Sequence, residues 1–492
     1  MQLLDDLQGF FAARHLPAYL VGGFLRDTLL GKPTRDIDIG LEGPTEVDVA
    51  ARDLAQFLSG TVVPLDSNRG IFRVVLADRR NIDLSGMPKG VKVDLPCRDF
   101  TINAMAVSFP KDTESPDTWA LIDPCGGQED LRKGLVRMVS PAVFRSDPAR
   151  LLRAIRLAAQ LQFDIDPETL DLLSREATLI NQVAAERIRD ELLNILAQPN
   201  LARSLTYLSE YGLLDFLIPE LLPAKGVTQP FEHYWDVYQH SLQCAVMVEN
   251  VLNSRFRQEE LAGQVIPWEP WLDEHFAQEA SDGHTRATLL KLAALLHDVS
   301  KPETKTVEPS GRARFLGHPT LGAKKAVEIA QRFRISGRGV TMLNTLVEQH
   351  LRPSHLAQRA DMPTRKAIYR YYRDLNDLGV DLLYLNMADY LAARGPTLEL
   401  QPWQFHCSRI ARTLEYIVGE TGPTRETSLV DGNDLINFFG LKPGPEFRPL
   451  LETVREAQAT GEITTRDEAI EFLKRDLGQS FLRVQTVGDE HA

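Results

Sequence analysis

The sequence predicts an α+β protein, with a small α/β head at the N-terminus and a long all-helical region after it. Short β-rich runs such as "AYLVGG", "RDIDIGL" and "GIFRVVLA" alternate with helical stretches over 1–140. After about residue 141, apolar residues recur at spacings of three and four, as in "PARLLRAIRLAAQLQF" and "AAERIRDELLNILAQ". With 492 residues, the chain is also too long for one ordinary core and indicates about two to four domains.

The composition is typical of a cytoplasmic protein. Apolar residues make up 43% of the chain and charged residues 25%. No apolar run approaches the roughly 20 residues that span a bilayer, and the acidic, amphipathic start "MQLLDDLQGFFAARH" is unlike a secretory signal. The four cysteines are scattered without a CxxC pair, which indicates neither a disulfide framework nor a thiolate zinc site. We therefore expect no membrane contact and a reducing, cytoplasmic location.

The first candidate site lies in the head, where "YLVGGFLRDTLLG" (19–31) is followed by "RDIDIG" (35–40). Side chains alternate along a strand, so Asp36 and Asp38 share one face. Two such carboxylates repel each other unless a cation lies between them, and hard oxygen ligands suit Mg²⁺. The alternative is a solvated edge strand. Gly22 and Gly23 form a strand-to-helix turn, whose helix N-terminus favours phosphate; the alternative is that the turn needs glycine only for backbone reasons.

Further motifs follow in a fixed order. They are "RDFTINAMA" (98–106), "LIDPCGGQEDLRKGLVRMV" (121–139) and "SDPARLLRAIRLAAQLQF" (146–163). Together with the glycine pair and "RDIDIG", they resemble the class II tRNA nucleotidyltransferases, which include CCA-adding enzymes and bacterial poly(A) polymerases. "AAERIRDELLNIL" (184–196) resembles a fifth motif of that family. The resemblance covers roughly the first 200 residues, with a looser match beyond them.

The resemblance implies a nucleotidyltransferase head in which Asp36 and Asp38 are catalytic and hold Mg²⁺. Asp99 is expected to accept a hydrogen bond from the ribose 2′-hydroxyl, while Arg98 and Asn103 support the sugar and phosphates or only brace the fold. The full set of expected nucleotide-binding residues is Gly22, Gly23, Arg26, Arg98, Asp99, Asn103, Asp147, Arg150, Arg153 and Arg156. Asp83, in "RRNIDLSG", is either a third carboxylate of the site or an exposed residue at a strand end.

Asp147 and Arg150 suggest how a base is chosen without a template. At positions i and i+3 of one predicted helix they are neighbours. A carboxylate accepts from an exocyclic amine, and a guanidinium donates to a ring nitrogen that is an acceptor. Cytosine and adenine offer this pattern, whereas uracil and guanine present a carbonyl beside an N–H. The same helix carries Arg145, Arg153 and Arg156, which form either a local basic groove or a solvated basic face.

The segment between the "IDL" strand and "RDFTINA" is only "SGMPKGVKVDLPC" (85–97). Complete CCA-adding enzymes of the family carry a longer loop here, so the resemblance favours an enzyme that adds CC to the tRNA 3′ end, with complete CCA addition from CTP and ATP as the alternative. A CC-adding enzyme needs a separate A-adding enzyme as partner. A poly(A) polymerase is disfavoured because the C-terminal tail is acidic, and a net charge of −13 argues against indiscriminate nucleic-acid binding.

The second half resembles an HD domain in "HYWDVYQHSLQCA", "LAALLHDVSKP", "FLGHPTLGA" and "MADYLAARG". His240, His297, Asp298 and Asp389 match its metal-ligand positions, which implies a second divalent metal and permits phosphohydrolase activity. Imidazoles and carboxylates within a helical bundle suit such an ion. The alternative is a scaffold for tRNA with an incidental metal. His318, His350 and His355 either contact phosphate or, for the last two, are surface histidines.

The expected domains are a catalytic head (1–140), a helical neck for nucleotide selection and RNA binding (141–225), an HD domain (226–420) and a C-terminal helical tail that binds tRNA (421–492). The hinge-like "LLPAKGVTQP" (221–230) separates neck and HD domain, and a polar insertion is expected near 254–285. An HD phosphohydrolase with an RNA-binding N-terminal half and a non-catalytic RNA-binding module are the competing functions. The Asp36 and Asp38 pair argues against the last.

Overall fold

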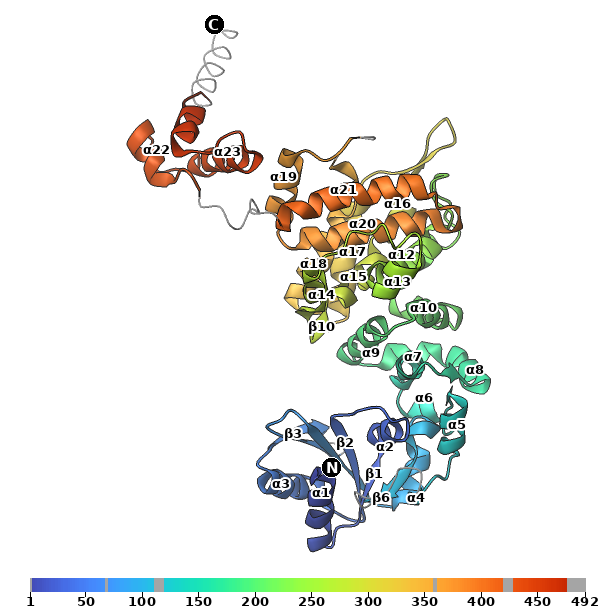
Figure 1. Cartoon of the computed structure of the whole chain (residues 1–492). Helices are drawn as coiled ribbons and strands as arrows, with labels where there is room; N and C mark the ends of the chain where they lie inside the picture. Colours follow the sequence, from blue (N-terminus) through green and yellow to red (C-terminus); the bar gives the residue numbers. More distant parts are fainter. Residues whose placement is uncertain (1, 67–69, 110–118, 357–360, 419–427, 476–492) are drawn as a thin grey trace. The chain divides into compact units, whose positions relative to one another are not determined.

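The computed structural model describes residues 2–66, 70–109, 119–356, 361–418 and 428–475. Contacts within the chain divide it into two units, Met1–Pro219 and Glu220–Ala492. The predicted fold class is confirmed, because a small mixed sheet lies in the N-terminal head and the chain beyond it is predominantly helical (Figure 1). Within the described part of the chain, no helix has both the length and the apolar character that crossing a membrane requires.

A six-stranded sheet forms the centre of the head. Its strands are β1 (Ala18–Val21), β2 (Asp36–Glu42), β3 (Thr61–Asp66), β4 (Ile71–Val75), β5 (Asn81–Met87) and β6 (Ala106–Ser108). The strand order is β3-β4-β5-β2-β1-β6. β2 and β5 run parallel, whereas the other neighbouring pairs run antiparallel. The sheet is therefore mixed, and its parallel pair lies at the centre.

The two faces of this sheet differ in what covers them. On one face, Ile37 and Ile39 of β2 join a core with α1 (Gln2–Ala13) and α3 (Val47–Leu58). The other face carries a smaller apolar cluster that includes Val21 and Leu95. Because side chains alternate along a strand, Asp36 and Asp38 point to this second face, beside α2 (Gly22–Leu29). The alternation read from "RDIDIG" is thus present in the structure.

Short helices and the neck complete the first unit. Its remaining helices and strands are α4 (Val91–Asp94), α5 (Gly127–Lys133), β7 (Leu135–Val136), α6 (Val143–Ser146), α7 (Arg150–Leu161), β8 (Asp164–Ile165), α8 (Pro167–Arg175), α9 (Ala185–Ala197), α10 (Leu201–Glu210) and α11 (Leu213–Leu217). α7 packs against α9 and α10. One face of α7 is apolar and buried, as its spacing predicted, so its arginines emerge on the opposite side.

The second unit is a helical bundle with two small hairpins. Its elements are α12 (Val237–Leu252), α13 (Ser254–Glu259), α14 (Trp271–Ala277), β9 (Glu279–Ser281), β10 (His284–Thr285), α15 (Arg286–Leu296), α16 (Lys301–Thr304), β11 (Lys305–Val307), β12 (Ala313–Phe315), α17 (His318–Arg332), α18 (Gly337–Gln349), α19 (Arg365–Leu375), α20 (Leu378–Arg394), α21 (Leu400–Val418), α22 (Gly432–Phe439) and α23 (Phe447–Thr460). α12 packs against α15 and α20, and α17 against α18. The segment 254–285, expected as a polar insertion, buries Leu272 and Phe276.

Candidate functional site

Asp36 and Asp38 stand at the start of β2, beside the start of α2. In the parallel ladder, Asp36 lies opposite Asn81 and Asp38 lies opposite Asp83. Asp38 Oδ2 accepts a 3.0 Å hydrogen bond from the backbone N–H of Phe24, and Asn81 donates to Asp36 Oδ1 at 2.8 Å. The first N–H groups of a helix have no acceptor within the helix. The N-terminus of α2 therefore stabilises the carboxylate of Asp38.

The glycine pair allows this close approach. Gly22 has a φ of +64°, which side chains rarely adopt, and a Cβ there would lie 3.0 Å from Asp38 Oδ2 and 3.3 Å from Arg98 Nη1. A Cβ on Gly23 would lie 3.4 Å from the same oxygen of Asp38. Gly22 is thus required for backbone conformation and for space next to the carboxylate.

The electrostatics of this pair favour a bound cation. Burial, followed by the nearby charge of Asp83, raises the pKa of Asp38, although the N–H of Phe24 and the charge of Arg98 oppose this. Asp83 is not an exposed strand-end residue, because it lies within β5 and forms a two-bond ion pair with Arg73 at 2.7 and 2.8 Å. Carboxylate oxygens that are costly to ionise in isolation fit a hard divalent ion such as Mg²⁺. Asp36 and Asp38 would hold it.

The "RDFTINA" segment forms a polar network next to α2. Asp99 is buried, and its Oδ1 accepts from the Phe100 N–H at 2.8 Å and from Asn103 Nδ2 at 3.0 Å. Burial by itself raises the pKa of Asp99, but the charge of Arg153 and these hydrogen bonds together lower it. Arg26 is buried and donates to Asn103 Oδ1 at 2.8 Å. Arg26 and Asn103 thus brace Asp99. Its Oδ1 already accepts two hydrogen bonds, whereas Oδ2 accepts one, from Arg153 Nη1 at 3.4 Å, and has a second lone pair for a further donor.

Asp147 and Arg150 occupy different positions from those expected. Asp147 follows the last residue of α6 and precedes α7, with an extended backbone, so it does not share a helix with Arg150. Arg150 donates to the carbonyl oxygens of Arg98 at 3.2 Å and Cys97 at 3.3 Å. The prediction of one shared helix is wrong because Pro148 follows Asp147 directly, and a residue before proline is disfavoured in helical conformation.

Asp147 has a partner that we did not single out from the sequence. Arg187, on α9, donates to Asp147 Oδ2 at 2.9 Å. Burial by itself raises the pKa of Asp147, but the hydrogen bond and charge of Arg187 lower it below the usual value. Arg187 belongs to "AAERIRDELLNIL", so the resemblance to a fifth motif was the signal that pointed to it.

Two of the arginines of α7, Arg153 and Arg156, are held by carboxylates, whereas Arg150 is held by carbonyl oxygens. Arg153 Nε and Arg156 Nε donate to the two oxygens of Glu191 at 3.2 and 2.6 Å, and Arg153 Nη1 also reaches Asp99 Oδ2 at 3.4 Å. Arg145 lies on α6, so the prediction that it shares a helix with Arg153 and Arg156 is wrong, and it pairs with Glu176. The face is therefore not simply solvated, and Arg153 links α7 to the "RDFTINA" segment of the head.

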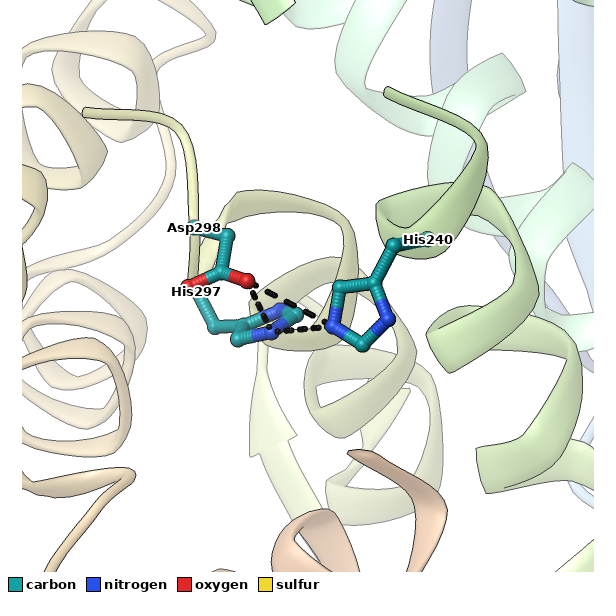
Figure 2. Close-up of side chains that lie close together, drawn as sticks. All are labelled: His240, His297 and Asp298. Carbon is teal, nitrogen blue, oxygen red and sulfur yellow. Dashed lines mark hydrogen bonds and ion pairs between the residues drawn. The ribbon is translucent and has the colours of Figure 1, made fainter. Parts of the chain in front are cut away.

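In the second unit, His240, His297 and Asp298 converge at the centre of the bundle, as Figure 2 shows. His240 comes from α12, and His297 and Asp298 directly follow α15. His240 Nε2 lies 3.2 Å from His297 Nε2 and 3.4 Å from Asp298 Oδ2. Asp389, on α20, adds an oxygen 3.0 Å from His240 Nε2. The structure brings together all the residues predicted for this site.

Two more histidines lie close to the other carboxylate oxygen of Asp298. His318, the first residue of α17, and His350, just after α18, place Nε2 atoms 3.3 and 3.8 Å from Asp298 Oδ1. His350 is 2% exposed, so the interpretation of it as a surface histidine is wrong. His355 is exposed, in agreement with that interpretation. Local helix patterns do not reveal that His318 and His350 meet at Asp298.

The donor set of this cluster fits a divalent metal. The Nδ1 atoms of His297, His318 and His350 each lie 2.6–2.7 Å from a backbone carbonyl oxygen, which leaves Nε2 to face Asp298. Among the described residues, His240 Nδ1 has no hydrogen-bond partner although it is buried. Burial by itself lowers the pKa of His297, but Asp298 and Asp389 raise it to about 10. A bound cation would take the place of that proton.

Three family models match the chain. They are the poly A polymerase head domain over 18–137, the probable RNA and SrmB-binding site of polymerase A over 162–225, and the HD domain over 237–394. An A-adding tRNA nucleotidyltransferase from Deinococcus radiodurans is 33% identical over 465 residues, which cover 93% of this chain and 95% of that protein. The chain belongs to the class II tRNA nucleotidyltransferase family, with an HD domain.

Other relatives of this nucleotidyltransferase differ in what they add. A CC-adding tRNA nucleotidyltransferase from Thermus thermophilus is 32% identical, and the matched region covers 93% of this chain and 93% of that protein. The solved structure of the Thermotoga maritima CCA-adding enzyme complexed with tRNA has the same fold, with a TM-score of 0.63, 22% identity and coverage of 97% of this chain and 95% of that one. The family is thus shown, while its curated members include both A-adding and CC-adding enzymes.

Proposed function

We propose that this nucleotidyltransferase adds CMP from CTP to the 3′ end of tRNA and releases pyrophosphate. The observation that carries the proposal is the pair Asp36 and Asp38, with Asp38 fixed against the N-terminus of α2. Bound Mg²⁺ would supply positive charge that neutralises the triphosphate and assists loss of the hydroxyl proton. The two carboxylates would hold and orient that charge. The tRNA 3′-oxygen bonds to the α-phosphorus as the bond to pyrophosphate breaks.

Base choice is assigned to Asp147 and Arg150. The carboxylate would accept a hydrogen bond from the exocyclic amine of cytosine or adenine, and the guanidinium would donate one to the unprotonated ring nitrogen. Uracil and guanine present a carbonyl beside an N–H, which is the reverse pattern, so this pair rejects them. Two features support this assignment: the hydrogen bond and charge of Arg187 lower the pKa of Asp147, and Arg150 is held by the carbonyl oxygens of Cys97 and Arg98. Each group is thus restrained before a nucleotide arrives, which reduces the ordering cost of binding.

We assign CC as the end point of addition. The segment 85–97 is folded, since it comprises the end of β5, α4 and a short 3₁₀ turn (Leu95–Cys97), with Val91 and Leu95 buried. A packed segment of this kind reshapes poorly when the pocket must change from cytosine to adenine. Relatives named as CC-adding, from Thermus thermophilus and Geobacter sulfurreducens, agree with this end point, whereas the Deinococcus radiodurans relative is named as A-adding. A separate A-adding enzyme would complete the tail.

The test uses tRNA transcripts that end before CCA, after C and after CC, each incubated with Mg²⁺ and one NTP at a time. We expect CMP addition to the first two transcripts, no extension of the third with ATP, and no addition by Asp36→Ala. Efficient addition of AMP to the third transcript would refute the CC end point. Extension of only that transcript would identify an A-adding enzyme, and a long run of AMP would identify a poly(A) polymerase.

The cluster around Asp298 favours a second activity, that of a divalent-metal phosphohydrolase. His240, His297, Asp298 and Asp389 would hold the metal, and His318 and His350 extend the site on the other side of Asp298. Bound metal would supply a water of lowered pKa and a charge for a phosphate oxygen. We expect hydrolysis of a generic phosphodiester with added divalent metal. The activity should vanish in His297→Ala/Asp298→Ala and persist in Asp36→Ala; persistence in the double variant would refute it.

RNA contact is assigned to the neck at 141–225 and to the C-terminal tail at 421–492. The match of 162–225 to a probable RNA-binding site supports the first part. Removing residues from 428 onward should raise KM for tRNA more than KM for CTP. Equal KM values for tRNA in the full chain and the truncated chain would refute the role of the tail.

A further inference from the structure

Glu42 is the last residue of β2, the strand that carries Asp36 and Asp38, the proposed Mg²⁺ ligands. Its Oε1 accepts a 3.1 Å hydrogen bond from the backbone N–H of Val91, the first residue of α4, and its Oε2 accepts from the Tyr19 hydroxyl at 2.9 Å. Gly90 has a φ of +92°, and a Cβ there would lie 2.9 Å from Glu42 Oε1. The carboxylate is thus closely fitted to the turn that starts α4.

The segment attached to this turn leads to the nucleotide-binding groups. Within it, Asp94 Oδ2 accepts from Arg98 Nε at 3.1 Å. Arg98 Nη1 lies near Gly22, on the side of Asp38. The carbonyl oxygens of Cys97 and Arg98 accept the guanidinium of Arg150. A displacement of the turn at 90–91 would therefore move the groups that hold Arg150.

We propose that Glu42 is a positioning residue that fixes the start of α4 and, through it, the placement of Arg98 and Arg150 for nucleotide binding. The role rests on the proposed nucleotidyl transfer. Glu42 does not touch the reacting atoms. It joins the strand of Asp36 and Asp38 to the segment that holds Arg150, the proposed base-selecting arginine. The proposed metal site and base site therefore keep fixed positions relative to each other.

The decisive variants are Glu42→Ala, which removes both hydrogen bonds, and Glu42→Gln, whose amide oxygen still accepts from Val91 while its NH₂ donates to Tyr19. Glu42→Ala should raise KM for CTP about fivefold or more, with little change in kcat, because one or two hydrogen bonds position the binding groups. It should also lower the preference for CTP over UTP. Glu42→Gln should restore the wild-type KM for CTP and the wild-type preference for CTP over UTP. Glu46→Ala, which removes an exposed carboxylate nearby, is the matched control.

A second measurement separates positioning from folding. Hydrogen exchange of the peptide that contains the Val91 amide should accelerate in Glu42→Ala and remain slow in Glu42→Gln, at unchanged melting temperature. Wild-type KM and base preference in Glu42→Ala would overturn the role, as would a proportional loss of rate with CTP and UTP together with a lower melting temperature. If the wild-type protein extends no tRNA, the proposed function and the role of Glu42 both fail. If the wild type is active and Glu42→Ala behaves like it, only the role of Glu42 fails.

Discussion

The hydrogen bond from Arg187 to Asp147 gives the sharpest quantitative prediction. Arg187→Ala removes a charged donor 2.9 Å from Asp147 Oδ2. Hydrogen bonds to charged groups contribute about 1.5–3 kcal/mol. The side chain of Arg187 is 45% exposed, whereas that of Asp147 is 5% exposed, so solvent screens the pair and the lower end applies. A loss of about 1.5 kcal/mol corresponds to about a tenfold change in an equilibrium constant.

The pH dependence of the same variant has a defined sign. In the wild type, Arg187 keeps the pKa of Asp147 low, so its stabilising contribution is present above the usual carboxyl pKa and is lost as pH falls through that lowered value. Without Arg187, the effect of burial raises this pKa. We therefore expect the acid limb of activity with CTP to move to higher pH.

The assay is steady-state incorporation of CMP into tRNA that ends before CCA, measured across a pH series. We expect about a tenfold higher KM for CTP in Arg187→Ala and an intermediate value in Arg187→Lys, which keeps the charge without the planar guanidinium. Arg189→Ala, which loses a bond to its neighbour Asp190 on the same helix, is the matched control. An unchanged KM together with an unchanged acid limb in Arg187→Ala would refute the reasoning.

Three further predictions concern the two sites. Asp38→Asn should abolish CMP addition but raise the melting temperature of the metal-free protein. Because burial raises the pKa of Asp38, the wild type loses stability as the pH rises through that raised pKa, so the gain in the variant should grow in the same direction. A lower melting temperature of Asp38→Asn, measured by calorimetry, would contradict this. Asp147→Ala should slow CTP use and reduce rejection of UTP and GTP, by about ten- to a hundredfold; single-NTP assays that find the wild-type order of preference would place selection elsewhere. Chelation of divalent metals should lower the melting temperature of the wild type more than that of His297→Ala/Asp298→Ala, as mass action requires; equal shifts would argue against metal at the cluster.

The sequence by itself determined the features that depend on local spacing. Alternation along "RDIDIG" placed Asp36 and Asp38 opposite Ile37 and Ile39, because side chains of any strand have a period of two. Apolar spacings of three and four predicted the helices of the neck and the bundle. The order of motifs predicted the family, which the comparisons confirm.

The tertiary structure alone decided which partners these residues have. Arg187 reaches Asp147 across 40 positions of the chain, and His318 and His350 meet at Asp298 from separate helices. It also decided that Glu42 holds the turn before α4, a contact across 49 positions. Spacing determines the face on which a side chain lies, but the packing of elements remote in sequence determines what that face meets. Local patterns carry no information about such long-range contacts, which is why these partners emerged only in the folded chain.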